Sequence, residues 1–204
     1  GITDIGKTRE SNQDSLYYNE SIGLGIVADG VGGNAGGEFA SRCVSNYIST
    51  FFEKKLNETI DSLMIKKIIL EANSNLLQEA KKNSTFQQMA TTVNVIYLSK
   101  GSLYIGHVGD SRTYLLDRGQ FWQLTIDHNI KTYIERNLLD NSQLTSNFNP
   151  EALVNIVGRE YCQPDLYTLP VKPGQFILTA SDGLFKMLSR DEIKITISQN
   201  KPID

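Results

Sequence analysis

Residues 26–37, with the sequence Ile-Val-Ala-Asp-Gly-Val-Gly-Gly-Asn-Ala-Gly-Gly, say most about how this chain folds. An apolar run stops there at Asp29, and five glycines follow within the next eight residues. A strand that delivers a carboxylate into a glycine-rich turn places a hard oxygen ligand where the backbone can closely approach an ion or a phosphate. The plainer alternative is a tight turn before a helix that begins near Gly37–Glu38. A nucleotide-binding loop fits poorly, because neither of the usual glycine-loop patterns is in register.

Two other apolar segments end in an acidic residue in the same way. Residues 104–110 end at Asp110, and residues 176–182 end at Asp182, which is followed by glycine. Each could simply close a turn through local hydrogen bonds. Three strand-end carboxylates in one small chain instead predict an all-oxygen centre, which suits Mg²⁺ or Mn²⁺.

The N-terminal segment Arg9-Glu10-Ser11-Asn12-Gln13-Asp14 joins a cation to a carboxylate just before the first expected hairpin. Asp14 is therefore a further candidate metal ligand, and the planar guanidinium of Arg9 is a candidate phosphate-binding group. The alternative for this segment is a solvated stretch with one ion pair.

Length and composition describe an ordinary globular chain. Its 204 residues, 40% hydrophobic and 21% charged, are expected to form a single domain. The net charge of −3 and the lack of a basic stripe argue against nucleic-acid binding. No apolar run reaches the ~20 residues of a membrane span. Cys43 and Cys162 are too few and too far apart for a disulfide framework, so a reducing, cytoplasmic setting is expected.

The hydrophobic periodicity predicts an α+β fold with antiparallel sheets. Residues 16–28 suggest a hairpin, and residues 38–52 and 65–80 suggest helices. Further strands are expected at residues 90–98, 103–108, 112–116, 121–124, 166–169 and 175–180.

Local signals also predict helix starts and a loop. Asp127 is a candidate cap for a short helix that reaches Arg136, and Ser189 with Glu192 predicts a capping box. Residues 138–150 are polar and are expected to form a mobile surface loop.

The two histidines, His107 and His128, are expected in structural, hydrogen-bonded roles, because one lies in an expected strand and the other at an expected helix start. No Ser-His-Asp or Cys-His arrangement emerges, and two histidines are too few for a His-rich zinc site.

Six short motifs occur in an order and at spacings that resemble the metal-dependent protein Ser/Thr phosphatases of the PPM class, the PP2C-like phosphatases, and their bacterial branch in particular. Singly each motif is weak, but six in this order, spread across nearly the whole chain, are very specific. They are Arg9-Glu10-Ser11-Asn12-Gln13-Asp14, Val27-Ala28-Asp29-Gly30-Val31-Gly32-Gly33, Met89-Ala90-Thr91-Thr92, Val108-Gly109-Asp110-Ser111-Arg112, Leu124-Thr125-Ile126-Asp127-His128 and Thr179-Ala180-Ser181-Asp182-Gly183-Leu184. The resemblance implies a sandwich of two antiparallel sheets flanked by helices, with a two-metal centre at one end.

The resemblance also implies roles for individual residues. Asp29 matches the carboxylate that bridges two metal ions, and Gly30 supplies a backbone carbonyl to one of them. Asp182 matches a ligand of one core ion, and Asp14 matches an acidic residue that acts partly through water. Asp110 matches the ligand of a third, weaker ion. The implied ions are Mn²⁺ or Mg²⁺.

Outside the metal ligands, Arg9 matches the family's phosphate-binding arginine, and residues from about 129 to 157 match the variable flap beside the active site, which influences substrate choice. The chain departs from the family at two points. Val31 stands where some members carry a histidine proposed as general acid, so a metal-bound water is expected to protonate the leaving group. The family's late Asp-Asn pair, which includes a core ligand and lies on a late strand, is absent up to Asp204, so we expect the chain to be truncated or to end early.

The implied reaction is single-step hydrolysis of phosphoserine or phosphothreonine on a protein, by a water that two ions activate. The implied partners are phosphorylated proteins, the substrates of a cognate Ser/Thr kinase, and the protein is expected to be a monomer. One alternative is a catalytically impaired regulatory or phosphoprotein-binding domain, which the missing ligand favours. Another is a relative that serves a dedicated partner in a bacterial regulatory switch. An unrelated metal-dependent phosphoesterase would explain the aspartates but not the six ordered motifs.

Overall fold

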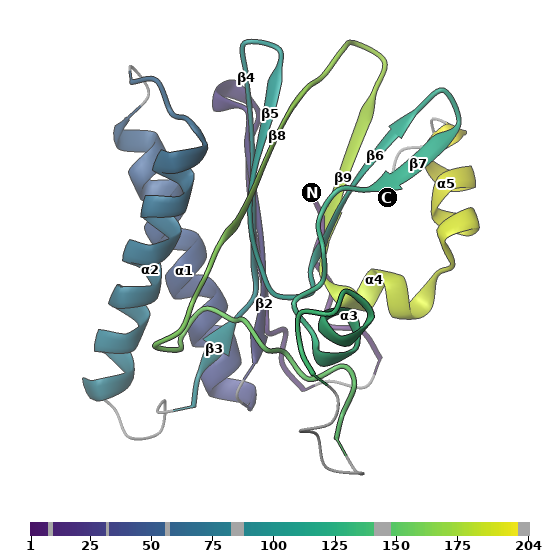
Figure 1. Ribbon diagram of the computed structural model, residues 1–204. Coiled ribbons are helices and arrows are strands. Elements are labelled where there is room, and N and C mark those ends of the chain that lie inside the picture. Colours follow the sequence, from purple (N-terminus) through teal and green to yellow (C-terminus); the bar gives the residue numbers. More distant parts are fainter. Residues whose placement is uncertain (8–9, 32, 56–57, 83–87, 141–147, 200–204) are drawn as a thin grey trace.

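Two antiparallel β-sheets lie side by side, with helices to either side, in the computed structural model of the protein (Figure 1). The structure describes residues 1–7, 10–31, 33–55, 58–82, 88–140 and 148–199. The larger sheet has the order β1 (Asp14–Asn19), β2 (Leu24–Val31), β4 (Val93–Ser99), β5 (Ser102–Val108) and β8 (Asp165–Pro170), with β3 (Ala90–Thr91) paired to β2. The smaller sheet has the order β7 (Gln120–Gln123), β6 (Arg112–Asp117) and β9 (Phe176–Ala180). The predicted α+β sandwich is confirmed.

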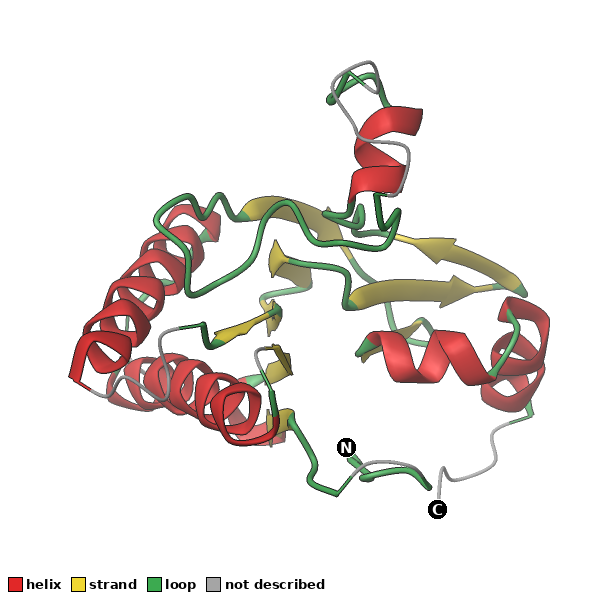
Figure 2. Ribbon diagram, turned by 90° about the horizontal axis from the view of Figure 1, so that it is seen from below, coloured by secondary structure: helices red, strands yellow, loops and turns green. Residues whose placement is uncertain are grey.

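The helices form two groups on opposite sides of the strands, which Figure 2 shows from below. The first group, α1 (Asn34–Lys54) and α2 (Ser62–Lys82), covers the outer face of the larger sheet. The second, α4 (Asp182–Met187) and α5 (Arg190–Ser198), lies beside the smaller sheet. A short 3-10 turn, η1 (Glu20–Ile22), joins β1 to β2, and α3 (Ile130–Glu135) lies at the same end of the sheets as α4.

The hydrophobic core fixes the larger sheet against its helices. One face of α2 is buried as the periodicity predicts, through Ile65, Ile68, Ile69, Ala72 and Leu76. Gly106 of β5 lets this helix approach the strand closely, since an added Cβ would lie 2.5 Å from Ile65 Cγ2 and 2.6 Å from Ile69 Cδ1. Each fully buried isoleucine contributes about 1.5–3 kcal/mol relative to exposure. The sheet that carries Asp29 is therefore a stiff platform.

Buried polar side chains join the two sheets. Asn94 of β4 donates to Thr113 Oγ1 (3.2 Å) and Thr179 Oγ1 (3.3 Å), which belong to β6 and β9. Because buried polar groups are costly unless paired, these bonds hold the sheets in one relative position. The ends of β2 and β9 that flank Asp29 and Asp182 are thereby kept close together.

Helix α1 begins three residues before the predicted Gly37–Glu38. Its N-cap is Gly33, with φ 85°, a backbone region that favours glycine. The glycine-rich stretch therefore supplies the first turn of the helix as well as the turn before it.

One predicted helix start is wrong and one is confirmed. Asp127 does not cap α3: Asn129 does, and its side chain accepts a backbone hydrogen bond at the third helical position (2.9 Å). Asp127 instead binds the guanidinium of Arg112. The capping box of Ser189 and Glu192 opens α5 as predicted, because both of its bonds are local.

Three smaller findings complete the fold. Cys43 and Cys162 are free thiols. In the described ranges, no helix combines the length and the apolar character needed to cross a membrane. Most of the predicted mobile loop 138–150 lies outside the described residues, namely residues 141–147.

Candidate metal centre

Asp29 lies inside β2, so the prediction that the strand ends at this carboxylate is wrong. The strand continues through Gly30 to Val31, because this end pairs with β3. The Asp29 N–H donates to Thr92 Oγ1 (3.0 Å), and its C=O accepts from the Thr92 N–H (2.9 Å) and from Thr91 Oγ1 (2.9 Å). The carboxylate is thus carried by a rigid piece of sheet.

Asp14 lies directly opposite Asp29 in the β1–β2 ladder. Like charges in this position destabilise an antiparallel pair unless something neutralises them. Ser181 Oγ donates to Asp14 Oδ2 (2.7 Å), which joins the end of β9 to the first strand. Asp182 is the first residue of α4, and only Ser181 separates it from the end of β9 at Ala180.

Asp110 lies in the turn between β5 and β6, as predicted. Gly109 before it has φ 109°, and its N–H donates to His128 Nδ1 (3.1 Å). Its C=O accepts from the His128 N–H (2.8 Å). Ser111 after it forms a buried hydroxyl pair with Thr92 Oγ1 (2.7 Å), next to Asp29. The turn is held from both sides, so the position of Asp110 is well defined.

The acidic residues interact strongly with one another. Burial, followed by the charges of Asp14, Asp182 and Asp110, raises the pKa of Asp29 to about 8. Burial, followed by the charges of Asp182 and Asp127, raises the pKa of Asp110 to about 6. Carboxylates that resist ionisation in this way are stabilised by a nearby cation.

Asp14, Asp29 and Asp182 open into a cleft of about 420 Å³. Its wall combines acidic and polar residues with a larger apolar part, and it also includes Ser11, Leu184 and Met187. Ser11 Oγ is buried and has no hydrogen-bond partner among the described residues. The cleft thus presents hard oxygen donors to any ligand that enters it.

The donor atoms of these residues suit divalent cations, but their side chains are not grouped as a complete set of ligands. Carboxylate oxygens and a backbone carbonyl are the donors that Mg²⁺ and Mn²⁺ take. Within the described part of the chain, however, no three side chains of His, Cys, Asp or Glu are grouped closely enough to hold an ion. Asp14 accepts a hydrogen bond from Ser181, and Asp182 is paired with Lys186.

Gly30 has no room for a side chain. An added Cβ would lie 2.1 Å from Gly37 O and 2.7 Å from Gln13 O. The N–H of Gly30 donates to the same Gln13 carbonyl (3.1 Å). Backbone therefore crowds around the residue that follows Asp29, and the assignment of its own carbonyl as a metal ligand stays a prediction.

Replacing Gly30 with Ala is expected to lower the free energy of unfolding by about 1–3 kcal/mol, because the new methyl group overlaps two backbone carbonyls. Gly36→Ala is the matched control in α1. Its Cβ would meet Met89 Cβ at 3.5 Å, an ordinary contact. Urea denaturation measures the free energy of unfolding of both variants. Equal values would show that the backbone around Gly30 can move to accommodate a methyl group.

Two predicted features cannot be located fully. Arg9, the predicted phosphate-binding residue, lies outside the described residues. The predicted flap, residues 129–157, is described except for residues 141–147. Its base is anchored to the body, since the Val154 N–H donates to the His128 carbonyl (2.9 Å) and Asn155 Nδ2 contacts His128 Nδ1 (3.0 Å).

Three residues beside the carboxylates were not predicted as part of the site. Lys186 contacts Asp182, which lies four residues earlier in α4. This spacing can be recognised in the sequence, because residues four apart share a helix face. Ser181 binds Asp14, but residues 167 positions apart give no local signal. Arg112 donates three hydrogen bonds of 2.6–3.0 Å to Asp127. The two residues are 15 positions apart, so no local sequence pattern predicts this pair.

His107 has the structural role that the sequence predicts. It is fully buried, with Nδ1 2.5 Å from Asn94 Oδ1 and Nε2 2.9 Å from the Ile126 carbonyl. Its ring lies 4.6 Å from that of His128. Burial, followed by the neighbouring imidazole, lowers the pKa of His107 to about 3.

The buried His107 is expected to make the fold acid-sensitive. In the unfolded chain an imidazole binds its proton near pH 6.5, while in the folded protein it does so only near pH 3. The unfolded state therefore binds more protons between these values, and stability falls as pH falls through this window. From pH 7 to 5.5, the wild type is expected to lose about 1 kcal/mol more than His107→Gln in urea denaturation. Equal losses would mean that His107 does not titrate in this way.

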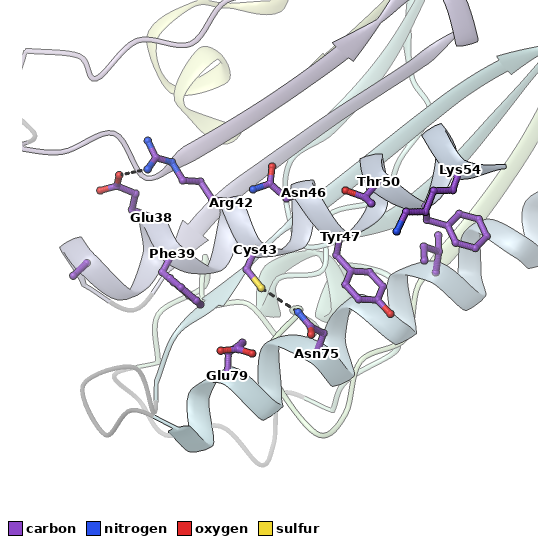
Figure 3. Close-up of a pocket in the computed structure, with 13 residues that line it drawn as sticks. Glu38, Phe39, Arg42, Cys43, Asn46, Tyr47, Thr50, Lys54, Asn75 and Glu79 are labelled. Atoms are coloured by element: carbon purple, nitrogen blue, oxygen red, sulfur yellow. Dashed lines mark hydrogen bonds and ion pairs between the residues drawn. The ribbon is translucent and has the colours of Figure 1, made fainter. Parts of the chain in front are cut away.

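A second pocket is larger but lies away from the carboxylates. It has a volume of about 870 Å³ and lies between α1 and α2, where Cys43 Sγ accepts a hydrogen bond from Asn75 (3.3 Å) and Arg42 pairs with Glu38 (Figure 3). Its wall is mostly aliphatic and aromatic with mixed charges. The aspartates singled out by the sequence line the smaller cleft and not this pocket.

Comparison with known proteins identifies the family of the chain. The family model for protein phosphatase 2C matches residues 6–199. A putative protein phosphatase 2C-type from Streptococcus pyogenes serotype M6 is 28% identical over 212 residues, which cover 99% of this chain and 85% of the relative. The structure of the S. agalactiae serine/threonine phosphatase is similar with a TM-score of 0.82 and 27% identity, over 100% of this chain and 86% of that one.

A further structure shares the fold. It is the catalytic domain of the serine threonine protein phosphatase PstP, solved in complex with two manganese ions. The TM-score is 0.80 at 24% identity, over 96% of this chain and 81% of that one. Since the family model spans nearly the whole sequence and the fold agrees, the predicted kinship is confirmed: the chain belongs to the protein phosphatase 2C family.

Proposed function

We propose that the protein hydrolyses phosphoserine and phosphothreonine on other proteins, with Mn²⁺ or Mg²⁺ as cofactor. The observation that carries this proposal is a cleft lined by Asp14, Asp29 and Asp182, in a chain of the protein phosphatase 2C family. The charges of Asp14, Asp182 and Asp110 all disfavour ionisation of Asp29. Similarity to a serine/threonine phosphatase supports the substrate class.

The residues that would hold the ions are the ligands predicted from the sequence. Asp29 would share its charge between two ions, Asp182 and the Gly30 carbonyl would each bind one, and Asp14 would act partly through water. Asp110 would hold a third ion more weakly. When bound, such ions supply a water of lowered pKa and positive charge for the phosphate oxygens.

The chain's own residues would prepare the site for this chemistry. The fixed backbone of Asp29 keeps its carboxylate in place without reorganisation, which is how charged groups in active sites act most effectively. Ser181 orients Asp14 by donating to its Oδ2. Arg9 would bind the phosphate with its planar fork. No side-chain nucleophile is required.

The substrates would be phosphorylated proteins made by a partner Ser/Thr kinase. The apolar part of the cleft wall, with Leu184 and Met187, offers contact to a peptide beside the phosphate. The flap, residues 129–157, would contribute to substrate choice. The protein would act as a monomer in the cytoplasm, within signalling pathways that reverse Ser/Thr phosphorylation.

The direct test is hydrolysis of matched phosphoserine, phosphothreonine and phosphotyrosine peptides by the purified chain, with Mn²⁺, with Mg²⁺ and with chelator. Release of phosphate from the first two peptides in the presence of metal, and none with chelator, is the expected result. Turnover that persists after exhaustive chelation would contradict the proposal.

A second candidate function is a phosphoprotein-binding module without turnover. The pairing of Asp182 with Lys186 and the lack of a finished three-residue ligand group among the described residues favour it. The same peptides distinguish the two functions, since a binding module would retain the phosphopeptide intact in a metal-dependent pull-down, whereas a phosphatase would release it dephosphorylated.

A further inference from the structure

Lys186 brings a positive charge to the acidic cleft. It lies four residues after Asp182, one helical turn along α4, and its ammonium forms an ion pair with Asp182 Oδ2. The Asp182 side chain, which lines the cleft, is 29% exposed, whereas that of Lys186 is 68% exposed. The ammonium therefore reaches Asp182 from the rim of the cleft.

The influence of this ammonium extends beyond its direct partner. Partial burial disfavours charged Lys186, but the hydrogen bond to Asp182 and the charges of Asp182, Asp110 and Asp29 outweigh it, so the pKa of Lys186 is raised. In return, the charge of Lys186 lowers the pKa of Asp110, against the larger effects of burial and neighbouring acids. One lysine thus compensates part of the repulsion among three aspartates.

We infer that Lys186 is a positioning residue for the metal centre, a tethered counter-ion that neutralises Asp182 until a divalent cation takes its place. The inference rests on the proposed function, because it treats Asp182 as a metal ligand. A cation that binds Asp182 competes with the ammonium for the negative charge of the same carboxylate. Lys186 therefore lowers the affinity of the site for metal and keeps the metal-free cleft from losing its shape through repulsion.

The experiment compares Mn²⁺ binding by isothermal titration calorimetry for the full chain and four variants. Lys186→Met keeps the length of the side chain without its charge, and Lys186→Arg keeps the charge. Lys67→Met is the matched control, because Lys67 forms an exposed ion pair with Glu71 at the same helical spacing in α2. Asp29→Asn reports on the metal site itself.

Lys186→Met is expected to bind Mn²⁺ about three- to tenfold more tightly than the wild type, since it removes both a competing ion pair and a nearby positive charge. Lys186→Arg and Lys67→Met are expected to stay within about twofold of the wild type, because one keeps the charge and the other lies outside the cleft. Thermal unfolding supplies a second readout. Lys186→Met is expected to melt below the wild type in chelator and to gain more than the wild type from Mn²⁺.

The outcomes separate this inference from the function on which it rests. If Asp29→Asn weakens Mn²⁺ binding but Lys186→Met binds no more tightly than the wild type, the counter-ion role is refuted and the metal site stands. If the wild type binds no Mn²⁺, or Asp29→Asn binds it equally well, both proposals fall.

Discussion

Replacing Asp29 with Asn is expected to reduce metal-dependent phosphopeptide hydrolysis by at least about 100-fold. The substitution removes one negative charge and keeps the size of the side chain. In the proposed centre that charge is shared by both ions, so its loss weakens each of them and the water between them. The measurement is the steady-state rate at saturating Mn²⁺ and peptide, with Mn²⁺ raised far above the wild-type requirement.

The control for this variant is Asp191→Asn. Asp191 is an exposed acidic residue in the first turn of α5, away from the cleft. It is expected to keep the wild-type rate, which excludes a general effect of losing one carboxylate. A rate for Asp29→Asn within about threefold of the wild type would be incompatible with a shared ligand at this position.

Removal of metal is expected to destabilise the wild type markedly. Without a cation, Asp14 and Asp29 oppose each other directly in the sheet, with Asp182 and Asp110 nearby. Mn²⁺ at about 100 times its dissociation constant adds about 2.7 kcal/mol of stability, or roughly 5–10 °C in Tm for a chain of this size. Differential scanning calorimetry in Mn²⁺ and in chelator measures this difference.

The stability of the Asp29→Asn variant is expected to depend much less on metal than that of the wild type. In chelator at pH 8 it should melt above the wild type, because it removes a carboxylate whose charge is disfavoured by burial and by the neighbouring aspartates. With Mn²⁺ it should gain little. An Asn variant that is less stable than the wild type in chelator would show that the aspartates do not repel one another as the pKa of Asp29 indicates.

Residues were predicted best where the signal is local. The capping box at Ser189 needs only its neighbours, and the periodicity of α2 needs only its own face. Asp127 also looked like a cap, but a distant arginine forms stronger, charge-assisted hydrogen bonds with it and a neighbouring asparagine takes the cap.

The candidate site was predictable as a set of residues but not as an arrangement. Three apolar runs that end in aspartate, together with the family resemblance, identified the carboxylates. That Asp14 opposes Asp29 depends on strand register, and that Ser181 binds Asp14 depends on how two sheets pack. Neither contact can be predicted from one segment of the sequence, because each joins segments that are distant along the chain. Lys186 could have been found from its spacing to Asp182, because residues four apart share a helix face.

The central claim is that aspartates from distant parts of the chain bind divalent cations in one cleft. Crystals soaked in Mn²⁺ and measured at the manganese absorption edge test this most directly. We predict anomalous peaks at coordination distance from the Asp29 carboxylate, with Asp182 among the other ligands. Density that shows both carboxylates free of metal at saturating Mn²⁺, or peaks only elsewhere on the molecule, would contradict it.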